Sequence, residues 1–263
     1  MSSPPWDYIA KLVCIGDSGC GKSSLTIRLC EGRFVQHHDV TIGVEFGSRI
    51  VPVGAPHSKP PRASQATETS PADSTSDSSP QPPKPEGLPP PPLKQDPPPP
   101  QKHMKLSLWD TAGQETYKSV TRSYFRGASG ALLVFDISRK ATFDHVTDWL
   151  NDLRQIAEPD IVVILVGNKA DLASEKREVD EADARDWARR NGVLQYVETS
   201  AKSGEGVEEA FLAVAERIYQ NIMAGKYDLN DRRSGVKGSA TGWGGGTNVR
   251  LDQEKVKSGG MCC

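Results

Sequence analysis

Large apolar residues are scarce in this chain of 263 residues. Only 36% of the residues are hydrophobic, and the mean hydropathy is −0.51. A compact α/β domain carries more apolar side chains than this, so we expect part of the chain to stay outside any folded core. No run of about 18 apolar residues is present and the first residues form no apolar stretch, so we expect neither a spanning helix nor a secretory signal.

The chain also lacks a strong excess of charge and a recognisable cysteine pattern. Its formal net charge is −2 at pH 7, so nothing in the overall balance favours a nucleic-acid partner. The five cysteines fit neither a metal site nor a disulfide framework, and they are Cys14, Cys20, Cys30, Cys262 and Cys263. Such cysteine usage is typical of a reducing compartment.

Proline is rare outside one segment. Residues 52–103 hold 17 of the 20 prolines, many Ser and Thr, and few large apolar residues. Such a segment cannot bury enough surface to offset its chain entropy, so we predict a disordered Pro/Ser-rich insertion with partial polyproline II character. Residues 1–51 and 104–224 then form one folded domain, and the glycine-rich residues 225–263 form a flexible tail.

The insertion has several open interpretations. Leu88–Lys94 contains four consecutive prolines that could dock an SH3 or WW domain, and Ser70 and Ser79, each followed by proline, could be phosphorylated. A neutral spacer or a retained intron is the simpler alternative. Lengthening a loop from about five to about fifty residues costs only roughly 2 kcal/mol of closure entropy, so we expect a folded domain in every case.

The stretch Gly16–Ser23 reads G-x-x-x-x-G-K-S between an apolar run and a helical pattern. A phosphate-binding P-loop requires this strand–loop–helix context, because its glycines let backbone N–H groups approach an oligophosphate at a helix start. Lys22 can reach the β- and γ-phosphates, and Ser23 can bind Mg²⁺. A Gly-rich turn with a solvated lysine is the alternative. The residues expected at the phosphates are Asp17, Ser18, Gly19, Cys20, Gly21, Lys22, Ser23 and Ser24.

Apolar runs and helical stripes alternate along the folded part of the chain. Strands are expected at 9–15, 44–51, 104–109, 131–136, 161–166 and 194–198, and helices after the P-loop, around 118–125, and at 143–157, 180–190 and 207–222. This alternation predicts an α/β fold with a mixed six-stranded sheet and five helices. The one antiparallel hairpin joins 44–51 to 104–109, on either side of the insertion.

Polar motifs follow the last two expected strands, where an open α/β sheet binds its ligand. The carboxylate of Asp171 can accept both N–H donors on the guanine edge, a pair that adenine lacks. The backbone of 199–202 can close the base pocket, although a plain strand–helix loop is the alternative. The residues expected at the base are Asn168, Lys169, Asp171, Ser200, Ala201 and Lys202.

A further motif, Asp110–Gln114, follows the strand at 104–109. Asp110 is placed to hold Mg²⁺, the Gly113 N–H to sense a γ-phosphate, and Gln114 to orient the attacking water as the catalytic residue. An acidic cap beside a polar glutamine is the alternative. Thr41 could complete the Mg²⁺ coordination and Phe34 could pack on guanine, although an ordinary loop threonine and a core phenylalanine explain them equally well.

In chain order these motifs resemble the five nucleotide motifs of the Ras-like small GTPases. The matching stretches are Gly16–Ser23, Thr41, Asp110–Gln114, Asn168–Asp171 and Thr199–Lys202. Ile42–Phe46, Trp109–Glu115 and Arg122–Ala128 look specifically like the Rab family, nearest to its endosomal-recycling and early-secretory members. Ser18 departs from the Ras pattern, which has glycine there, whereas Rabs tolerate small residues at this position. The resemblance leaves out the insertion and the tail.

The resemblance implies a GTP-binding and GTP-hydrolysing switch that uses GTP/GDP and Mg²⁺. It implies that GTP orders switch I around Thr41 and switch II from Asp110 to about Phe125. It also implies that effectors read Phe46, Trp109 and Tyr124, for which ordinary core packing is the alternative. The implied partners are a GEF, a GAP that accelerates slow intrinsic hydrolysis, and effectors.

The pair Cys262-Cys263 resembles the double-cysteine end of Rabs, where both thiols carry geranylgeranyl groups, and is not a C-a-a-X pattern. Two lipid chains give stable membrane anchoring, where one gives marginal binding. The implied partners are Rab escort protein with geranylgeranyl transferase, and GDI. The implied location is the cytoplasmic face of endosomal or Golgi and early secretory membranes, in vesicle traffic, with cycling through the cytosol. An accidental pair of thiols is the alternative.

Two other classes of function compete with this interpretation. The chain could be a P-loop ATPase or kinase, against which the guanine-type Asp171 argues. It could also be a scaffold with an inert nucleotide site whose Pro-rich segment binds partners. Lys22, Thr41 and Gln114 argue against an inert site, because all three have the register that GTP hydrolysis requires.

Overall fold

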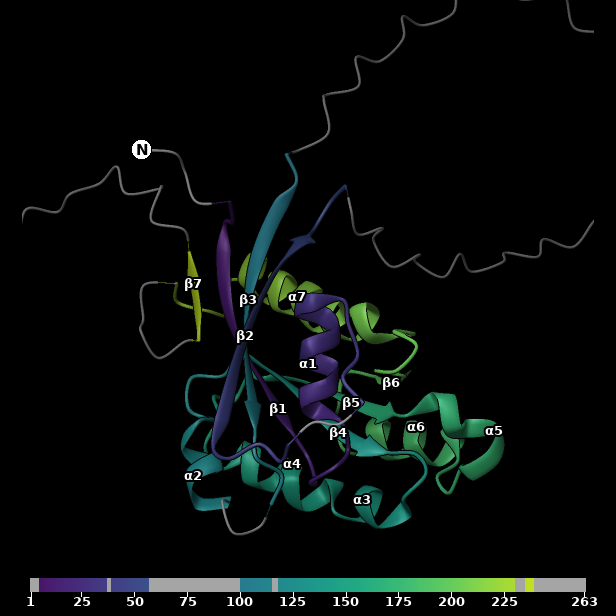
Figure 1. Cartoon of the computed structure of the whole chain (residues 1–263). Coiled ribbons are helices and arrows are strands. Elements are labelled where there is room, and N and C mark those ends of the chain that lie inside the picture. The colour runs from purple at the N-terminus through teal and green to yellow at the C-terminus, as the bar shows by residue number, and fades with distance from the viewer. Residues whose placement is uncertain (1–4, 37–38, 57–99, 115–117, 230–234, 239–263) are drawn as a thin grey trace, which may run out of the picture.

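A mostly parallel sheet lies between two layers of helices (Figure 1). The structure is a computed structural model and describes residues 5–36, 39–56, 100–114, 118–229 and 235–238. The strands are β1 (Tyr8–Ile15), β2 (Val44–Val53), β3 (Lys102–Thr111), β4 (Gly130–Asp136), β5 (Val162–Asn168), β6 (Tyr196–Thr199) and β7 (Val236–Gly238). The helices are α1 (Lys22–Glu31), α2 (Lys118–Ser123), α3 (Lys140–Asp144), α4 (Val146–Arg154), α5 (Ala173–Lys176), α6 (Glu181–Arg190) and α7 (Val207–Met223), with a 3₁₀ turn, η2 (Ala170–Leu172).

The sheet order is β2-β3-β1-β4-β5-β6, with β7 also paired to β1. The pairs from β3 to β6 are parallel, and β2 is antiparallel to β3. Every residue of β4 and β5 is buried, which is why both read as continuous apolar runs. This arrangement confirms the α/β fold with one antiparallel hairpin, and it adds a seventh strand.

Each face of the sheet has its own core. Leu25 of α1 packs in the same cluster as Phe211 of α7, whereas Leu150 of α4 and Ala184 of α6 belong to the cluster on the opposite face. The alternation of side chains along each strand feeds both clusters, because successive residues point to opposite faces. Within the described ranges, none of the helices combines the length and apolar character that a membrane span requires.

The hairpin β2–β3 is longer than the sequence pattern indicates. Pairing runs from Val44 opposite Thr111 to Val53 opposite Lys102, so it enters the segment that we assigned to the insertion. The carboxylate of Asp7 accepts hydrogen bonds from Lys102 Nζ at 2.8 Å and from the backbone N–H of His103 at 2.9 Å. Figure 1 shows both strands extending past the rest of the sheet. Most of the insertion, including Leu88–Lys94, lies outside the described residues.

The helix expected at 143–157 is two short helices. α3 ends at Asp144 and α4 begins at Val146, with His145 between them in a helical conformation (φ −82°, ψ −7°). The apolar stripe that suggested one helix continues through the joint, because Val146, Trp149 and Leu150 remain buried on one side. The joint brings the side chain of His145 to the phosphate loop.

β7 lies in the segment that the sequence analysis assigned to a flexible tail. β4 pairs with β1 only from Leu12 onward, so the edge of β1 before that residue is open to another strand. β7 pairs antiparallel with it from Tyr8 to Ala10, and its Val236 is fully buried in the core. The preceding carbonyl of Gly235 accepts the Lys11 N–H at 3.0 Å. A strand of three residues with a distant partner leaves no periodic signal in the sequence.

The packing of β7 against β1 predicts that substitutions at its buried and exposed positions change the stability of the protein by different amounts. We expect Val236→Ala to lower the free energy of unfolding by about 2 kcal/mol, because two buried methyl groups are lost and a small cavity forms. Lys237→Ala, at the exposed neighbouring position, is the matched control and should change it by less than about 0.5 kcal/mol. Urea unfolding of both variants measures the difference, and equal stability would mean that β7 does not hold to the sheet.

Candidate nucleotide site

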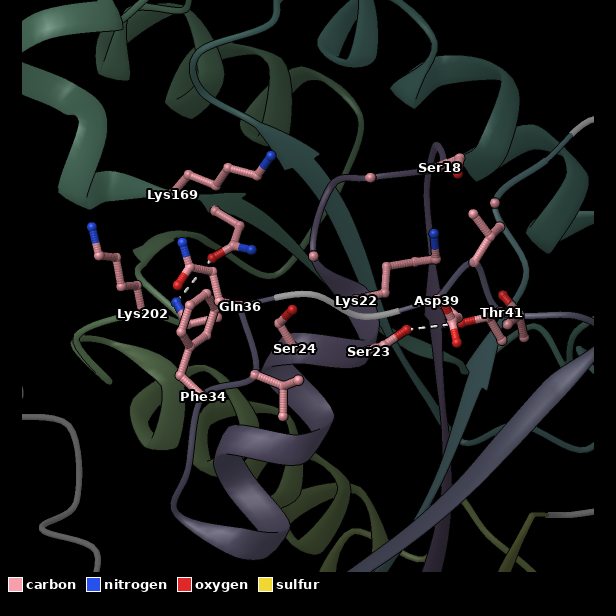
Figure 2. A pocket seen from close by; sticks show the side chains of 18 of the residues that line it. Ser18, Lys22, Ser23, Ser24, Phe34, Gln36, Asp39, Thr41, Lys169 and Lys202 are labelled. Carbon is pink, nitrogen blue, oxygen red and sulfur yellow. Dashed lines mark hydrogen bonds between the residues drawn. The ribbon is translucent and has the colours of Figure 1, made fainter.

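A cavity of about 440 Å³ opens at the carboxyl end of the sheet, above the start of α1. Figure 2 shows Lys22, Ser23 and Thr41 at one end of it and Phe34, Lys169 and Lys202 at the other. Its lining contains Ser18, Gly19, Gly21, Lys22, Ser23, Ser24, Phe34, Val35, Gln36, Asp39, Val40, Thr41, Thr111, Gly113, Asn168, Lys169, Asp171, Ala201 and Lys202. The motifs that follow the separate strands therefore meet in one place.

The phosphate loop holds a buried ammonium group. Lys22 Nζ donates to the carbonyl oxygens of Gly16 and Asp17, both at 2.9 Å, and the side chain is almost fully buried. Burial lowers the pKa of Lys22, and the negative charge of Asp110 opposes this shift. Gly16, at φ +138°, has no room for a side chain, because an added Cβ would lie 2.0 Å from the Val134 carbonyl oxygen. The loop shape therefore requires glycine there.

Ser23, Thr41 and Asp110 come together at one side of the cavity. The Ser23 hydroxyl lies 2.9 Å from the Thr41 hydroxyl and donates to the Asp110 carboxylate. Thr41 and Asp110 are both buried. Hydroxyl and carboxylate oxygens are the ligands that Mg²⁺ prefers, and Mg²⁺ sites usually combine one or two carboxylates with waters and substrate phosphates. The three residues fit Mg²⁺, which would neutralise charge on bound phosphate oxygens there.

Gly113 approaches the phosphate loop closely. A Cβ added to it would lie 2.4 Å from Lys22 Nζ and 2.6 Å from the Gly16 carbonyl oxygen, so the backbone of this residue lies beside the loop. A side chain at this position would collide with the loop, so the close approach requires glycine. Gln114 follows, half-buried, as the last described residue before 115–117, which lie outside the described residues.

The other end of the cavity is built from Asn168, Asp171 and the loop 199–202. Asn168 Nδ2 donates to the Cys20 carbonyl at 2.8 Å, and its Oδ1 accepts the Ala201 N–H at 3.2 Å. Asn168 thus ties the phosphate loop to the loop that closes the base end. The Ser200 hydroxyl donates to Asp171 Oδ1 at 2.7 Å, which fixes the orientation of this carboxylate.

Lys169 lies over the cavity in a left-handed conformation, with φ +70°. Its Nζ pairs with the Asp136 carboxylate at 2.7 Å. Burial raises the pKa of Asp136, but hydrogen bonds from Lys169 and Ser138 outweigh it and hold this pKa below its usual value. Phe34 also lines the cavity and is 38% exposed, so it is not a core residue.

Some expected contacts lie beside the cavity instead of in its lining. Among the described residues, those that we expected at the ligand but that do not line the cavity are Asp17, Cys20, Asp110, Gln114 and Ser200. Cys20 is fully buried, and the carboxylate of Asp17 points away, toward His145 and Trp149. Direct contacts of these side chains with a ligand remain predictions.

A comparison with protein families decides what kind of site this is. The model of the Ras family matches residues 11–59 and 94–220, which is more than half of the chain. The chain belongs to the Ras family. Ras-family proteins are small GTPases, which bind GTP and GDP with Mg²⁺, hydrolyse GTP, and interact with exchange factors, activating proteins and effectors. The motifs that meet in the cavity have the chemistry for these ligands.

Two arginines of this Ras-family protein also support the site, and sequence reasoning missed them. Arg28 of α1 donates to the backbone carbonyls of Ala201 at 2.8 Å and Lys202 at 2.6 Å, so it holds the base-end loop. Arg139 donates to the Ser18 carbonyl at 3.0 Å from outside the phosphate loop. The helical periodicity at 25–29 indicates which face is apolar, but it does not indicate which distant backbone carbonyl the half-buried Arg28 reaches.

The geometry at the base end predicts a change of base specificity. We expect Asp171→Asn to weaken GDP binding by about 10- to 100-fold and to favour xanthine nucleotides, because an amide offers a donor where guanine needs an acceptor. Asp160→Asn, at an exposed position at the opposite end of β5, is the matched control. Competition of GDP and XDP for a fluorescent nucleotide measures the preference. Unchanged guanine preference would exclude Asp171 as the base reader.

The position of Gln114 predicts a hydrolysis defect. We expect Gln114→Leu to slow single-turnover GTP hydrolysis by about tenfold or more while GTP affinity stays unchanged, because only the orientation of the attacking water is lost. Gln195→Leu, before β6 and outside the cavity lining, should hydrolyse GTP at the wild-type rate. Wild-type turnover in the Gln114 variant would remove this residue from catalysis.

Proposed function

We propose that this Ras-family GTPase is a Rab-type switch that recruits effectors to membranes in vesicle traffic. The observation that carries the proposal is a surface aromatic cluster of Phe46, Trp109 and Tyr124, in which Phe46 is exposed and the other two rings are half-buried. The rings of Phe46 and Trp109 meet edge to face with centroids 4.6 Å apart, and Tyr124 lies 5.6 Å from Trp109. Phe46 is 66% exposed, which argues against ordinary core packing for this ring, whereas Trp109 packs partly against the core.

The cluster is directly connected to the proposed Mg²⁺ ligands. Trp109 and Asp110 are neighbours on β3, and Phe46 pairs with Trp109 in the hairpin. Successive side chains of a strand point to opposite faces, so one strand presents the aromatic ring outward and the carboxylate inward. Ile42, 77% exposed, adds apolar surface on the segment after Thr41. A ligand-dependent change at Thr41 or Asp110 would therefore alter the surface that a partner contacts.

Hydrolysis in this proposal is slow until a GAP binds. Gln114 orients the water, and Lys22 neutralises charge on the phosphates. None of the described residues that line the cavity is an arginine, so the cavity offers no arginine finger of its own. Such an arginine, supplied by a partner, accelerates hydrolysis by about 10³–10⁵. A GEF would act in the opposite direction, by releasing GDP.

Membrane attachment rests on Cys262-Cys263, which lie outside the described residues. We propose that both thiols are geranylgeranylated by a transferase with Rab escort protein, and that GDI returns the protein to the cytosol. The protein would then act on the cytoplasmic face of endosomal or Golgi and early secretory membranes. A partner with an SH3 or WW domain could bind the prolines of Leu88–Lys94 in addition.

Membrane fractionation tests the lipid anchor. We expect the wild-type chain to sediment with membranes and the double variant Cys262→Ser, Cys263→Ser to stay in the supernatant, because both lipid attachment sites are lost. Cys30→Ser is the matched control, since Cys30 is a half-buried cysteine of the folded domain. Equal membrane fractions of the wild type and the double variant would contradict the proposal, whether or not the protein hydrolyses GTP.

A further inference from the structure

The carboxylate of Asp17 in the phosphate loop is held from outside the cavity. Trp149 Nε1 donates to Asp17 Oδ1 at 2.8 Å, and His145 Nδ1 lies 2.7 Å from Asp17 Oδ2. Both carboxylate oxygens therefore have a partner at the α3–α4 joint. The backbone carbonyl of the same residue accepts Lys22 Nζ at 2.9 Å. Asp17 thus connects the joint to the lysine that faces the phosphates.

The two partners of Asp17 differ in their exposure to solvent and in whether they titrate near neutral pH. Trp149 is 5% exposed and packs in the core beneath the sheet, so it offers a fixed donor at every pH. The His145 side chain is 57% exposed, so its proton exchanges freely with solvent. Only the imidazole can gain or lose charge near neutral pH. One contact is thus permanent, and the other depends on protonation.

We propose that His145 is a positioning residue whose imidazolium holds the phosphate loop in its nucleotide-retaining shape. The inference rests on nucleotide binding at the cavity, and it assigns to the α3–α4 joint a role in how long the nucleotide stays. The joint acts on the first arm of the loop, Asp17 and Ser18, while Gly21 and Lys22 of the second arm line the cavity. The neighbouring Arg139 holds the Ser18 carbonyl on the same arm.

The charges around His145 favour the imidazolium. The hydrogen bond and negative charge of Asp17 raise the pKa of His145, the weak burial opposes them, and Asp148 of α4 and Asp144 of α3 add smaller raising effects. The stabilisation is fully present below the ordinary pKa of histidine, about 6.5, and is lost as pH rises through the raised pKa of the folded protein. Nucleotide release should therefore accelerate with rising pH.

The expected size of the effect is modest because the pair is exposed. Exposed ion pairs contribute up to about 1 kcal/mol, which corresponds to about a fivefold change in a rate or an equilibrium constant. The GDP phosphate also titrates near this range in every variant. The informative quantity is therefore the ratio of the wild-type release rate to that of a variant without the imidazole, measured at each pH.

Release of a fluorescent GDP from the full chain with Mg²⁺, between pH 6 and pH 8.5, tests the proposal. We expect His145→Gln to release GDP about threefold faster than the wild type at pH 6 and at a similar rate at pH 8.5. His145→Arg, with a charge that does not titrate, should release slowly at both pH values. Trp149→Phe should release faster throughout and keep the dependence on pH. His103→Gln, on β3 and outside the cavity lining, should follow the wild type.

The outcomes separate the inference from the function on which it rests. A pH-independent ratio between His145→Gln and the wild type would overturn the proposal, because a merely structural histidine acts equally at every pH. Rapid release by His145→Arg at pH 6 would overturn the role of the charge. A folded wild-type chain that binds no GDP would instead overturn the nucleotide-binding function, and the inference with it.

Discussion

The burial of the Lys22 ammonium group is the constraint on which the site depends. A buried charge costs several kcal/mol unless it is paired and hydrogen-bonded. Two backbone carbonyls of the phosphate loop accept two of its three N–H donors, which leaves one donor for a ligand. A bound phosphate would accept a hydrogen bond from the Lys22 ammonium group and pair with its positive charge. The loop is therefore shaped to bind an anion.

Holding this loop in place requires distant parts of the chain. Asn168 reaches the Cys20 carbonyl from the end of β5, and the Thr111 hydroxyl donates to the Cys14 carbonyl at 2.7 Å from the end of β3. The α3–α4 joint holds Asp17 from the outside. Because Asn168 and Thr111 each end a strand, the order of the sheet brings these two side chains to the loop and to the end of β1. The fold thereby fixes the base and phosphate ends relative to each other.

The described residues that follow the phosphate loop into β2 are held by fewer contacts near the cavity. Thr41 contacts the phosphate end through the Ser23 hydroxyl, and Ile42 and Phe46 beyond it are exposed. A loop with few buried apolar contacts opens at low cost, so a γ-phosphate and Mg²⁺ can change its equilibrium with modest binding energy. A rigid phosphate loop and weakly held neighbouring loops together form the physical basis of a nucleotide switch.

The sequence predicted the parts of this architecture that local patterns encode. Buried strands such as β4 and β5, the helix after the phosphate loop, and the meeting of the strand-end motifs all follow from periodicity and from the rule for parallel sheets. β7 was missed because three residues carry no period, and the joint at His145 because an apolar stripe passes through it unbroken.

The supporting contacts of Asp17 and Arg28 were missed for another reason. They join residues far apart in the chain, and only the folded backbone determines which side chain reaches which atom. Asp7 likewise holds Lys102 from outside the β2–β3 hairpin, at the end where pairing continues past the expected strand. We placed the ends of the insertion where the prolines are dense, at 52 and 103. The backbone pairing of β2 with β3 continues to Val53 and Lys102.

We infer that the nucleotide, and specifically its γ-phosphate, orders two loops against a rigid phosphate loop. Amide hydrogen exchange of the full chain, loaded with Mg²⁺ and either GDP or a non-hydrolysable GTP analogue, tests it most directly. We predict that residues 34–46 and 110–125 exchange more slowly with the GTP analogue, while 16–23 and 162–168 exchange equally slowly in both states. Identical exchange of the two loops in both states would mean that the γ-phosphate does not order them.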